Sequence, residues 1–535
     1  MTEGTASDLV YLRADTKIEP LASRWYVWPH LLSPVTRAYN MAYRYLPMLR
    51  SFTANPAVHL AAAANPEFFC APFMQLEEGE IPGVRSLLQA TMKRCSNQIG
   101  FAENLAKLTE QLQQDAIGQN LDEVYRQLPD DLAGLVEIVY DLSNRPQLRI
   151  IEGLACTAAC LDNREEQEVA FFSAQDEQRH FFLNTPRLNA PGRVFFKLPF
   201  DDQRFDLLAT ARISPISFSA LADSLGVESS SRDEFRRFFQ LEPPIRSDAD
   251  YHGDGIRVRY FGHACVLIQV AGLSILIDPT MPSEQLPPQQ RFTFGELPDF
   301  IDYVFLTHNH QDHFVPEIFL QLRKRIGRIL VPGNNQSCIA DPSLKLALRS
   351  LGFDNVDVLN ALDSVQIPHG SLTSLPFYGE HAGLDIHSKH GLSVSIKGKH
   401  LLFLADADCV DRALYRRLAA RLGKVDVLFI GMECHGAPLT WIYGPYLTHP
   451  PSRKDDESRR LSGSDCEKAW AIVEEFSCAN VFVYAMGQEP WLKHLLGLQY
   501  TPDSKQIVES NKFVQQCMDV GIPASRLYGC HEFVL

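Results

Sequence analysis

Residues 303–313, Tyr-Val-Phe-Leu-Thr-His-Asn-His-Gln-Asp-His, contain the strongest signal in this chain. The first four residues predict a β-strand, and three imidazoles and a carboxylate follow them closely. In an extended chain alternate side chains share a side, so His308, His310 and Asp312 point one way and His313 lies off that line. One loop can therefore supply ligands to two adjacent metal ions. A solvated histidine-rich loop is the alternative, but the strand before this loop and the apolar helix after it hold it at a sheet edge.

The spacing HxHxDH resembles that of the metallo-β-lactamase fold, in which an αββα sandwich carries a dinuclear metal site at the edges of its sheets. Two earlier segments support the resemblance: 261–268 resembles the first hairpin of that fold, and Asp278 matches an aspartate that ends a strand. The resemblance covers about 256–535. It implies that Asp278 orients a metal-binding imidazole, and a turn aspartate before Pro279 is the alternative.

Further ligands are expected where later strands end. Asp406, in Phe-Leu-Ala-Asp-Ala-Asp at 403–408, matches the carboxylate that bridges the two metals, and Asp408 is less favoured because it lies deeper in the loop. His435, in Met-Glu-Cys-His-Gly at 432–436, matches the last histidine ligand. A buried structural histidine is the alternative at that position.

The remaining ligand is where this chain departs from hydrolases of the fold. The sequence Gly379-Glu380-His381 stands where those enzymes carry a histidine. Neighbours in an extended segment face opposite ways, so only one of Glu380 and His381 is expected to bind metal, and spacing does not decide which. With Glu380 the site has four imidazoles and three carboxylates, a donor set that favours iron and dioxygen activation. With His381 the same site suits two zinc ions and a bridging hydroxide nucleophile.

Composition and charge limit the other classes of function. The 535 residues include 50 Lys and Arg and 65 Asp and Glu, which gives a net charge of −15 and argues against a nucleic-acid partner. No apolar run is long enough for a membrane helix, and the first residues lack the pattern of a signal peptide. The 12 cysteines follow neither a zinc-ribbon nor a disulfide spacing. We therefore expect a cytoplasmic protein with no membrane partner.

The histidines place a domain boundary near residue 250. Only three of 17 precede it, and 241–255, rich in Pro, Gly and Asp, has the composition of a linker. Residues 1–250 are expected to form a mostly helical domain, because 81–114 and 121–142 carry apolar residues at helical spacing. The segment 215–240 could imitate a helix-turn-helix, but the acidic charge favours a packing pair of helices. Residues 251–535 are expected to form the metal domain, which makes the fold class α+β.

The chain length, the helical amino-terminal part and the four motifs together resemble the diiron metallo-β-lactamase-fold β-hydroxylases, a group that includes the β-hydroxylase of chloramphenicol biosynthesis. These enzymes hydroxylate the β-carbon of an aminoacyl group held as a thioester on a non-ribosomal peptide synthetase carrier domain. The resemblance implies L-p-aminophenylalanine as the aminoacyl group, two iron ions with an oxo or hydroxo bridge, and dioxygen as cosubstrate. It implies that Glu380 replaces a histidine and tunes the site for oxygen activation. The implied ligands are His308, His310, Asp312, His313, Glu380, Asp406 and His435.

Electrons are expected from an external donor, because no flavin or nicotinamide fingerprint is visible. The expected partners are therefore a loaded carrier domain and an electron-transfer protein. The amino-terminal domain is expected to support self-association, as in a homodimer, and to shape the substrate entrance. Basic clusters at 323–328 and 416–421 could meet an acidic carrier, although solvated helix faces are the favoured interpretation.

The loop 436–466 is expected to line the substrate cavity, and a self-packed Ω-loop is the alternative. Its candidate residues are Trp441, Tyr443, Tyr446 and His449. Two other functions stay open: a dizinc hydrolase of an ester, lactone, thioester or phosphoester, and a carrier-binding scaffold with a relic metal domain. The metal bound would separate the oxygenase from the hydrolase, and converging ligands would exclude the scaffold.

Overall fold

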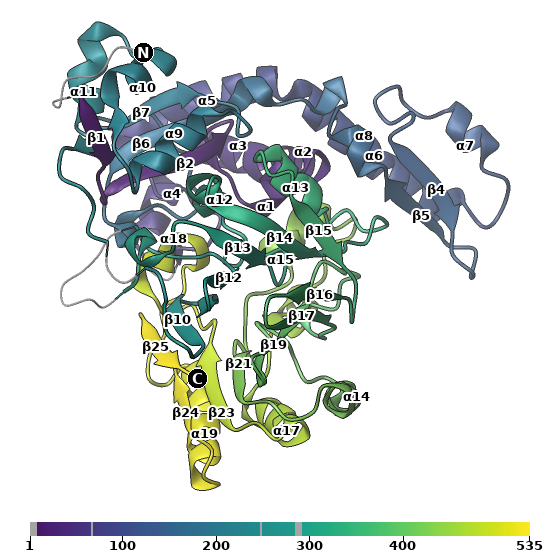
Figure 1. Ribbon diagram of the computed structural model, residues 1–535. Coiled ribbons are helices and arrows are strands. Elements are labelled where there is room, and N and C mark those ends of the chain that lie inside the picture. Colours follow the sequence, from purple (N-terminus) through teal and green to yellow (C-terminus); the bar gives the residue numbers. More distant parts are fainter. Residues whose placement is uncertain (1–7, 66–67, 247–248, 284–290) are drawn as a thin grey trace.

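The structure, a computed structural model, describes residues 8–65, 68–246, 249–283 and 291–535. The predicted linker therefore lies in part, at 247–248, outside the described residues. Two seven-stranded β-sheets form the centre of the molecule (Figure 1). Each sheet combines an antiparallel part with a parallel part.

The first sheet has the strand order β15-β14-β13-β12-β11-β10-β25. Strands β10 to β12 form the predicted antiparallel meander, and β12 to β15 run parallel to one another. Both faces are covered by other elements, which explains why the strands are near-continuous apolar runs. The strands are β10 (Arg257–Gly262), β11 (Cys265–Val270), β12 (Leu273–Ile277), β13 (Ile301–Phe305), β14 (Ile326–Pro332), β15 (Val356–Leu359) and β25 (His531–Val534).

The second sheet has the strand order β16-β17-β19-β20-β21-β23-β24. Its antiparallel part comes first in the chain, and β20, β21, β23 and β24 are parallel. The strands are β16 (Ser364–Ile367), β17 (Gly370–Leu375), β19 (Gly391–Ile396), β20 (Lys399–Phe403), β21 (Val427–Gly431), β23 (Asn480–Tyr484) and β24 (Ala524–Arg526).

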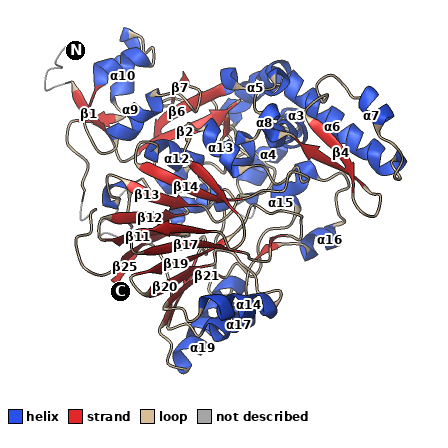
Figure 2. Ribbon diagram, turned by 45° about the vertical axis from the view of Figure 1, so that its right-hand side comes forward, coloured by secondary structure: helices blue, strands red, loops and turns tan. Residues whose placement is uncertain are grey.

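The two sheets lie face to face, and helices cover their outer faces (Figure 2). Residues of both sheets, such as Ile268 and Phe429, share the core between them. The second sheet packs against α14 (Arg412–Leu422), α17 (Cys466–Phe476) and α19 (Lys505–Asp519). The first sheet packs against α12 (Pro316–Leu322), α13 (Leu344–Ser350) and the amino-terminal part of the chain. This layer order is the predicted αββα sandwich, which is thereby confirmed.

The amino-terminal part contains more β-structure than its sequence pattern predicts. The segment 81–114 forms the helices α5 (Ile81–Arg94) and α6 (Ser96–Asp115), but 121–142 contains only the short α7 (Asp122–Arg126) before a strand. Three small sheets have the orders β3-β2-β6-β7, β8-β1-β9 and β4-β5. Their strands are β1 (Leu9–Leu12), β2 (Thr16–Ala22), β3 (Trp25–Tyr26), β4 (Val136–Tyr140), β5 (Pro146–Ile150), β6 (Gln167–Ser173), β7 (Val194–Lys197), β8 (Ile216–Ser217) and β9 (Phe239–Gln240).

Strand β2 shows why the pattern of apolar and polar residues did not predict these sheets. It is buried along its whole length although it carries Lys17 and Glu19. Lys17 pairs with Asp176 at 2.6 Å, and Glu19 pairs with Arg179 at 2.8 Å. Tertiary ion pairs therefore compensate buried charges that, in the sequence alone, resemble a solvated face.

The other amino-terminal helices include one long helix with an irregular turn in its middle. The helices are α1 (Pro29–Leu32), α2 (Pro34–Asn40), the π-helical turn η1 (Met41–Tyr45), α3 (Leu46–Ala54), α4 (Pro56–Ala63), α8 (Glu152–Ala155), α9 (Arg204–Ala211), α10 (Phe218–Ser224) and α11 (Arg232–Arg236). The last two correspond to the predicted packing pair. Along the described residues, none of the helices combines the length and the apolar character that a membrane span requires.

The amino-terminal part and the metal domain share a hydrophobic core. One buried cluster contains residues of both, among them Trp25, Phe182, Phe314 and Leu492. The Tyr26 hydroxyl also donates a hydrogen bond to the buried Glu317 of α12, at 2.9 Å. The two parts therefore share one continuous core and stabilise each other.

Candidate metal centre

The ends of parallel strands from both sheets meet at one edge of the sandwich. β13 leads into the loop with the HxHxDH motif, β20 leads to Asp406, and β21 leads to Glu433. Ligand sites of α/β folds commonly lie at the carboxyl ends of parallel strands, because loops distant in sequence converge there.

Six of the seven predicted ligands come together at this edge. They form overlapping groups in which the potential ligand atoms lie within 4.8 Å of one another. Asp406 belongs to two groups and so links the two halves of the cluster, whereas Asp408 pairs with Lys468 at 2.8 Å. The groups are His308 with His310 and Glu380; His308 with His313 and Asp406; His263 with Asp312 and His313; and Glu380 with Asp406 and Glu433.

The cluster contains buried polar atoms that have no hydrogen-bond partner. An unpaired buried polar group costs about 1–3 kcal/mol, so such atoms are rare unless something binds them. These atoms come from several ligand candidates at once, and imidazole nitrogens with carboxylate oxygens form a donor set that suits iron or zinc. The residues therefore fit a metal centre. The unpaired atoms are His308 Nε2, His313 Nε2, Glu380 Oε2 and Asp406 Oδ1.

Asp278 orients the ring of His313, as expected from its position after β12. Its carboxylate lies 2.8 Å from His313 Nδ1, and it also accepts hydrogen bonds from the backbone N–H and the hydroxyl of Thr307, at 2.7 and 2.6 Å. A carboxylate can only accept, so His313 Nδ1 carries a proton and Nε2 is the nitrogen that faces the cluster. That nitrogen lies 3.1 Å from Asp406 Oδ2.

His263 plays a comparable part for Asp312, although its place in the first hairpin was the one feature that pointed to it beforehand. The backbone N–H of Gly487 donates to His263 Nδ1 at 3.1 Å, so Nε2 carries the proton. Nε2 lies 2.9 Å from Asp312 Oδ2 and donates to it. His263 also has a φ of 51°, a rare backbone conformation that is often found at functional sites.

Glu380 and His381 both approach the ring of His310, from its two nitrogens. Glu380 Oε1 lies 2.8 Å from His310 Nδ1, and His381 Nδ1 lies 3.1 Å from His310 Nε2. Both side chains reach His310 because Glu380, in the short strand β18 (Glu380–His381), has a φ of 65°, which lies outside the extended region. Only Glu380 belongs to groups of potential ligand atoms; His381 contacts the Tyr443 hydroxyl at 2.8 Å.

The seventh predicted ligand, His435, does not join the cluster. It is exposed at the rim of the cavity and belongs to no group of potential ligands among the described residues. Glu433, two residues earlier, lies within the cluster instead. Alternate residues share a side of the chain, so Glu433 and His435 could both point towards the cluster after β21. Glu433 is nearer to the end of the strand, and this was the one feature of the sequence that favoured it.

Burial and neighbouring charges perturb the pKa values in the cluster. Burial lowers the pKa of His308 well below its ordinary value, which favours a neutral ring with a free lone pair. Burial also acts to lower the pKa of His313, but the carboxylates of Asp406, Asp312 and Asp278 outweigh it and raise that pKa well above normal. Burial, then Glu380 and Asp406, raise the pKa of Glu433. The carboxylates thus attract positive charge, as a metal site requires.

A cavity of about 250 Å³ opens beside the cluster. The loop 436–466 lines part of it, but this loop contains the short helices α15 (Thr440–Tyr443), η9 (Gly444–Tyr446) and α16 (Arg453–Ser458) and the strand β22 (Leu461–Ser462), so it is not irregular throughout. Trp441 lines the cavity, Tyr443 lies behind His310, and His449 is exposed. Other apolar lining residues include Ile442, Leu461, Leu496 and Leu498.

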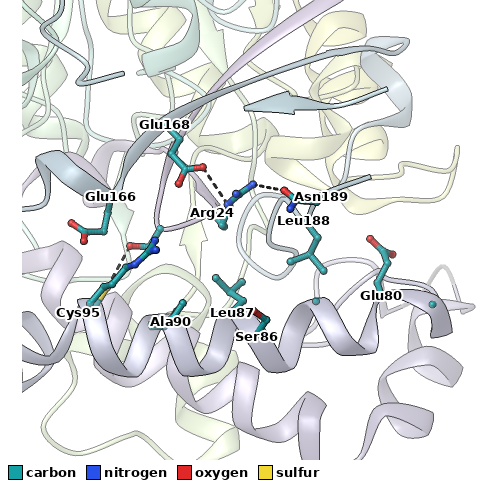
Figure 3. Close-up of a pocket in the computed structure, with 15 residues that line it drawn as sticks. Arg24, Glu80, Ser86, Leu87, Ala90, Cys95, Glu166, Glu168, Leu188 and Asn189 are labelled. Atoms are coloured by element: carbon teal, nitrogen blue, oxygen red, sulfur yellow. Dashed lines mark hydrogen bonds and ion pairs between the residues drawn. The ribbon is translucent and has the colours of Figure 1, made fainter. Parts of the chain in front are cut away.

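A larger cavity, of about 350 Å³, lies in the amino-terminal part against α5 (Figure 3). Arg24 extends along it and is already paired, with Glu168 at 3.2 Å and with the side-chain oxygen of Asn189 at 3.1 Å. Among the described residues, none of the potential metal groups lies in its lining. The cavity of about 250 Å³ is therefore the better candidate for the active site, because it lies beside the potential metal-binding groups.

Two members of the basic cluster at 323–328 have a structural role, whereas Lys324 and Arg328 are exposed. Arg323 is buried and bonds to Asp206 of α9 at 2.7 Å, and Arg325 is buried against the backbone oxygens of Leu297 and Pro298. Neither can meet a carrier domain. The arginines at 416, 417 and 421 lie exposed on α14.

Comparison with known proteins agrees with this geometry. Residues 11–243 match the family "Diiron non-heme beta-hydroxylase N-terminal domain", and residues 257–442 match "Beta-lactamase superfamily domain". The 4-amino-L-phenylalanyl-[CmlP-peptidyl-carrier-protein] 3-hydroxylase of Streptomyces venezuelae is 33% identical over 97% of this chain and 98% of its own length. The crystal structure of CmlA, a diiron beta-hydroxylase from Streptomyces venezuelae, superimposes with a TM-score of 0.92 and 32% identity, covering 98% of this chain and 99% of that one.

A hydrolase is similar over a shorter stretch. The UPF0173 metal-dependent hydrolase of Ligilactobacillus salivarius is 29% identical over 33% of this chain and 71% of its own length. The similarity to hydrolases is thus partial, whereas the similarity to the hydroxylase extends over both parts of the molecule.

Proposed function

This chain belongs to the diiron non-heme β-hydroxylase family, and on that basis we propose that it hydroxylates the β-carbon of a 4-amino-L-phenylalanyl group held as a thioester on a peptidyl carrier protein. The observation that carries the proposal is the donor set at the sheet edge. This donor set contains more carboxylates than that of a dizinc hydrolase, because Glu380 stands where a hydrolase has a histidine. Donor sets rich in oxygen favour iron.

We assign the ligands from the overlapping groups of potential donors. His308, His310 and Glu380 would hold one iron ion, and Asp312 and His313 the other. Asp406 would lie between the two ions, because it belongs to a group on each side. Glu433, which shares a group with Glu380 and Asp406, replaces His435 in this assignment.

Two iron ions in this site would supply the dioxygen activation that replaces a C–H bond by C–OH. The protein's own residues hold the ligands in place for this chemistry. Asp278 keeps the proton on His313 Nδ1, and His263 donates to Asp312, so both ligands present lone pairs towards the cluster. The burial of the cluster limits access of water.

The cavity suits an aromatic aminoacyl group. Trp441 and three leucines provide apolar walls against which an aromatic ring can pack. Gln311 also lines the cavity; it is 3% exposed and its Oε1 has no partner. This oxygen can accept a hydrogen bond from an amine of the substrate, which would satisfy a buried polar atom.

The same lining explains why the substrate would be a thioester. Among the described residues that line the cavity, none is a lysine or an arginine. A free amino acid would bring a carboxylate with no side-chain cation to pair with, whereas a thioester removes that charge. The carrier protein would supply remote binding energy that positions the substrate, so its loss should lower turnover as well as affinity. The electron donor and self-association stay predictions.

Metal analysis and product analysis test the proposal together. Iron-loaded protein, supplied with dioxygen, a reductant and carrier-bound 4-amino-L-phenylalanine, should add one oxygen atom at the β-carbon, detected by mass spectrometry of the released amino acid. The His435→Gln variant is the matched control, because this residue lies at the cavity rim outside the ligand cluster. Hydrolysis of the thioester without oxygen insertion, by protein that binds zinc and not iron, would contradict the proposal.

A further inference from the structure

A further cavity, of about 380 Å³, lies where the amino-terminal part meets the metal domain. Residues of α1, α2 and the segment 153–167 line it from the amino-terminal part, and residues of α13 line it from the metal domain. The purple α1 and the green α13 pack beside each other (Figure 1). In the described part of the chain, no group of potential metal ligands contributes to this lining. The cavity is therefore separate from the candidate metal centre, and its volume is within the range of about 300–1,000 Å³ that small-molecule sites have.

Among the described residues that line this cavity, Arg37 of α2 is the one buried charged residue, with 4% of its surface exposed. Its guanidinium donates to the backbone oxygens of Leu161 and Leu31, at 2.6 and 3.4 Å. Its Nε has no partner, and none of the described carboxylates forms an ion pair with this side chain. Burial lowers the pKa of Arg37 to about 10, so the group still carries its charge at neutral pH. A buried charge without a counter-ion is costly, so this cavity favours a ligand that brings a negative charge.

Asn163, which also lines the cavity, supplies a second donor without a partner. Its orientation follows from a chain of hydrogen bonds. The backbone N–H of Phe200 can only donate, and it donates to Gln167 Oε1 at 2.8 Å, so the amide NH₂ of Gln167 donates to Asn163 Oδ1 at 3.0 Å. This leaves Asn163 Nδ2 unpartnered, although the residue is only 6% exposed. An acceptor in the cavity would satisfy this amide and the guanidinium of Arg37 together.

We propose that this cavity binds a small organic monocarboxylate, with Arg37 as its counter-ion and Asn163 Nδ2 as a second donor. One buried cation without a counter-ion matches one negative charge. The other charged residues of the lining are exposed to solvent, and two of them, Arg164 and Asp201, pair with each other at 2.7 Å. The ligand should also have an apolar body, because much of the lining is apolar. The apolar lining residues include Leu31, Leu32, Phe200 and Leu346.

A carboxylate bound here would contact both parts of the molecule. Arg37 belongs to α2 of the amino-terminal part and Leu346 to α13 of the metal domain, and both line the cavity. A ligand that binds the folded chain and not the unfolded one stabilises the fold as its concentration rises above its Kd. Binding should therefore raise the midpoint of thermal unfolding. The site is independent of the proposed hydroxylation, so either proposal can fail while the other stands.

Titration of full-length, iron-loaded protein with 4-fluorobenzoate, followed by fluorine NMR, tests the proposal. The neutral analogue 4-fluorobenzamide is the matched control ligand, and we expect it to bind roughly 10-fold more weakly or worse, because it cannot form the charge-assisted hydrogen bonds. Arg37→Met should weaken 4-fluorobenzoate binding by a similar factor, since methionine fills space but has neither charge nor donor. Asn163→Asp should weaken it too, because it keeps an acceptor for Gln167 but replaces the free NH₂ by a negative oxygen. Arg325→Met is the matched control variant: Arg325 is also 4% exposed and bonded to backbone oxygens, but it does not line this cavity.

Several outcomes would overturn the site. Binding of 4-fluorobenzoate with wild-type affinity in both Arg37→Met and Asn163→Asp would place the ligand elsewhere, for instance on iron. Equal affinity for the benzamide, or no binding at millimolar ligand, would also contradict the proposal. Inorganic phosphate that binds more tightly than 4-fluorobenzoate, and is lost in Arg37→Met, would overturn the carboxylate class. If circular dichroism shows that Arg37→Met does not fold, Asn163→Asp and the comparison of the two ligands decide.

Discussion

Replacing Asp278 by asparagine should weaken metal binding through His313. The substitution keeps the shape of the side chain but puts an amide NH₂ where one carboxylate oxygen accepts hydrogen bonds. An NH₂ group facing His313 Nδ1 donates to it, which favours the tautomer with the proton on Nε2. That tautomer has no lone pair on the nitrogen that faces Asp406, so His313 would cease to be a ligand.

The size of the effect follows from the hydrogen bonds of Asp278. The residue is fully buried, and its carboxylate accepts from His313 at 2.8 Å and twice from Thr307. A hydrogen bond to a charged group contributes about 1.5–3 kcal/mol. Loss of a residue that orients a metal-binding histidine typically weakens metal affinity by roughly 10–100-fold, which corresponds to about 1.4–2.8 kcal/mol. Both estimates agree, so we expect a 10–100-fold loss of iron affinity.

Iron affinity can be measured by competition with a chelator, with iron content determined by elemental analysis. The matched control is Asp341→Asn, because Asp341 is also buried and also accepts several hydrogen bonds, from Ser388, Asn335 and His387, but orients no ligand candidate. It should lose stability without losing iron. The reasoning is refuted if Asp278→Asn keeps wild-type iron affinity, or if Asp341→Asn loses iron equally.

Four further outcomes are expected. Glu380→His should raise the ratio of bound zinc to iron, measured by elemental analysis, because it replaces an oxygen donor by a nitrogen; an unchanged ratio would count against Glu380 as a ligand. Glu433→Gln should lower iron content more than His435→Gln, and the reverse order would restore His435 as the ligand. Carrier-loaded substrate should turn over faster than free 4-amino-L-phenylalanine, and equal kcat values would contradict the role of the carrier. Burial lowers the pKa of His390 from 6.5 to about 3, so the neutral ring contributes stability that is complete above pH 6.5 and lost as the pH falls towards 3. Urea unfolding of the wild type should therefore show a steeper loss between pH 6.5 and 5 than His390→Gln, by up to about 1.4 kcal/mol per pH unit, and parallel curves would show that His390 does not titrate in this way.

The HxHxDH loop could be predicted from the sequence because its geometry is local. Ligand spacing within one loop after one strand depends only on the period of an extended chain. Sheets covered by outer helices could also be predicted, since short apolar runs and helical spacing are local signals, whereas the αββα arrangement was implied by the resemblance to a known fold. The resemblance also implied that Asp278 orients an imidazole, but it did not specify His313.

Which of two nearby residues joins the cluster could not be predicted from local sequence. The tertiary structure determined it. Glu380 and His381 both reach His310 because the backbone at Glu380 leaves the extended region, and a sequence without glycine at that residue gives no sign of it. Glu433 joins the cluster and His435 does not, because the chain after β21 places one inside the cavity and the other at its rim.

The amino-terminal part shows the same limit most clearly. Its polar residues Lys17, Glu19 and Arg179 look solvated in the sequence but are buried in ion pairs. Tyr443 and His30 are separated by more than four hundred residues, yet they lie beside each other, and Tyr443 contacts the candidate ligand His310. Sequence by itself determined the periodic elements and the ligands that one loop can supply, because these depend on neighbouring residues. Only the tertiary structure decided which charges pair and which rings meet, because such contacts depend on how distant segments pack.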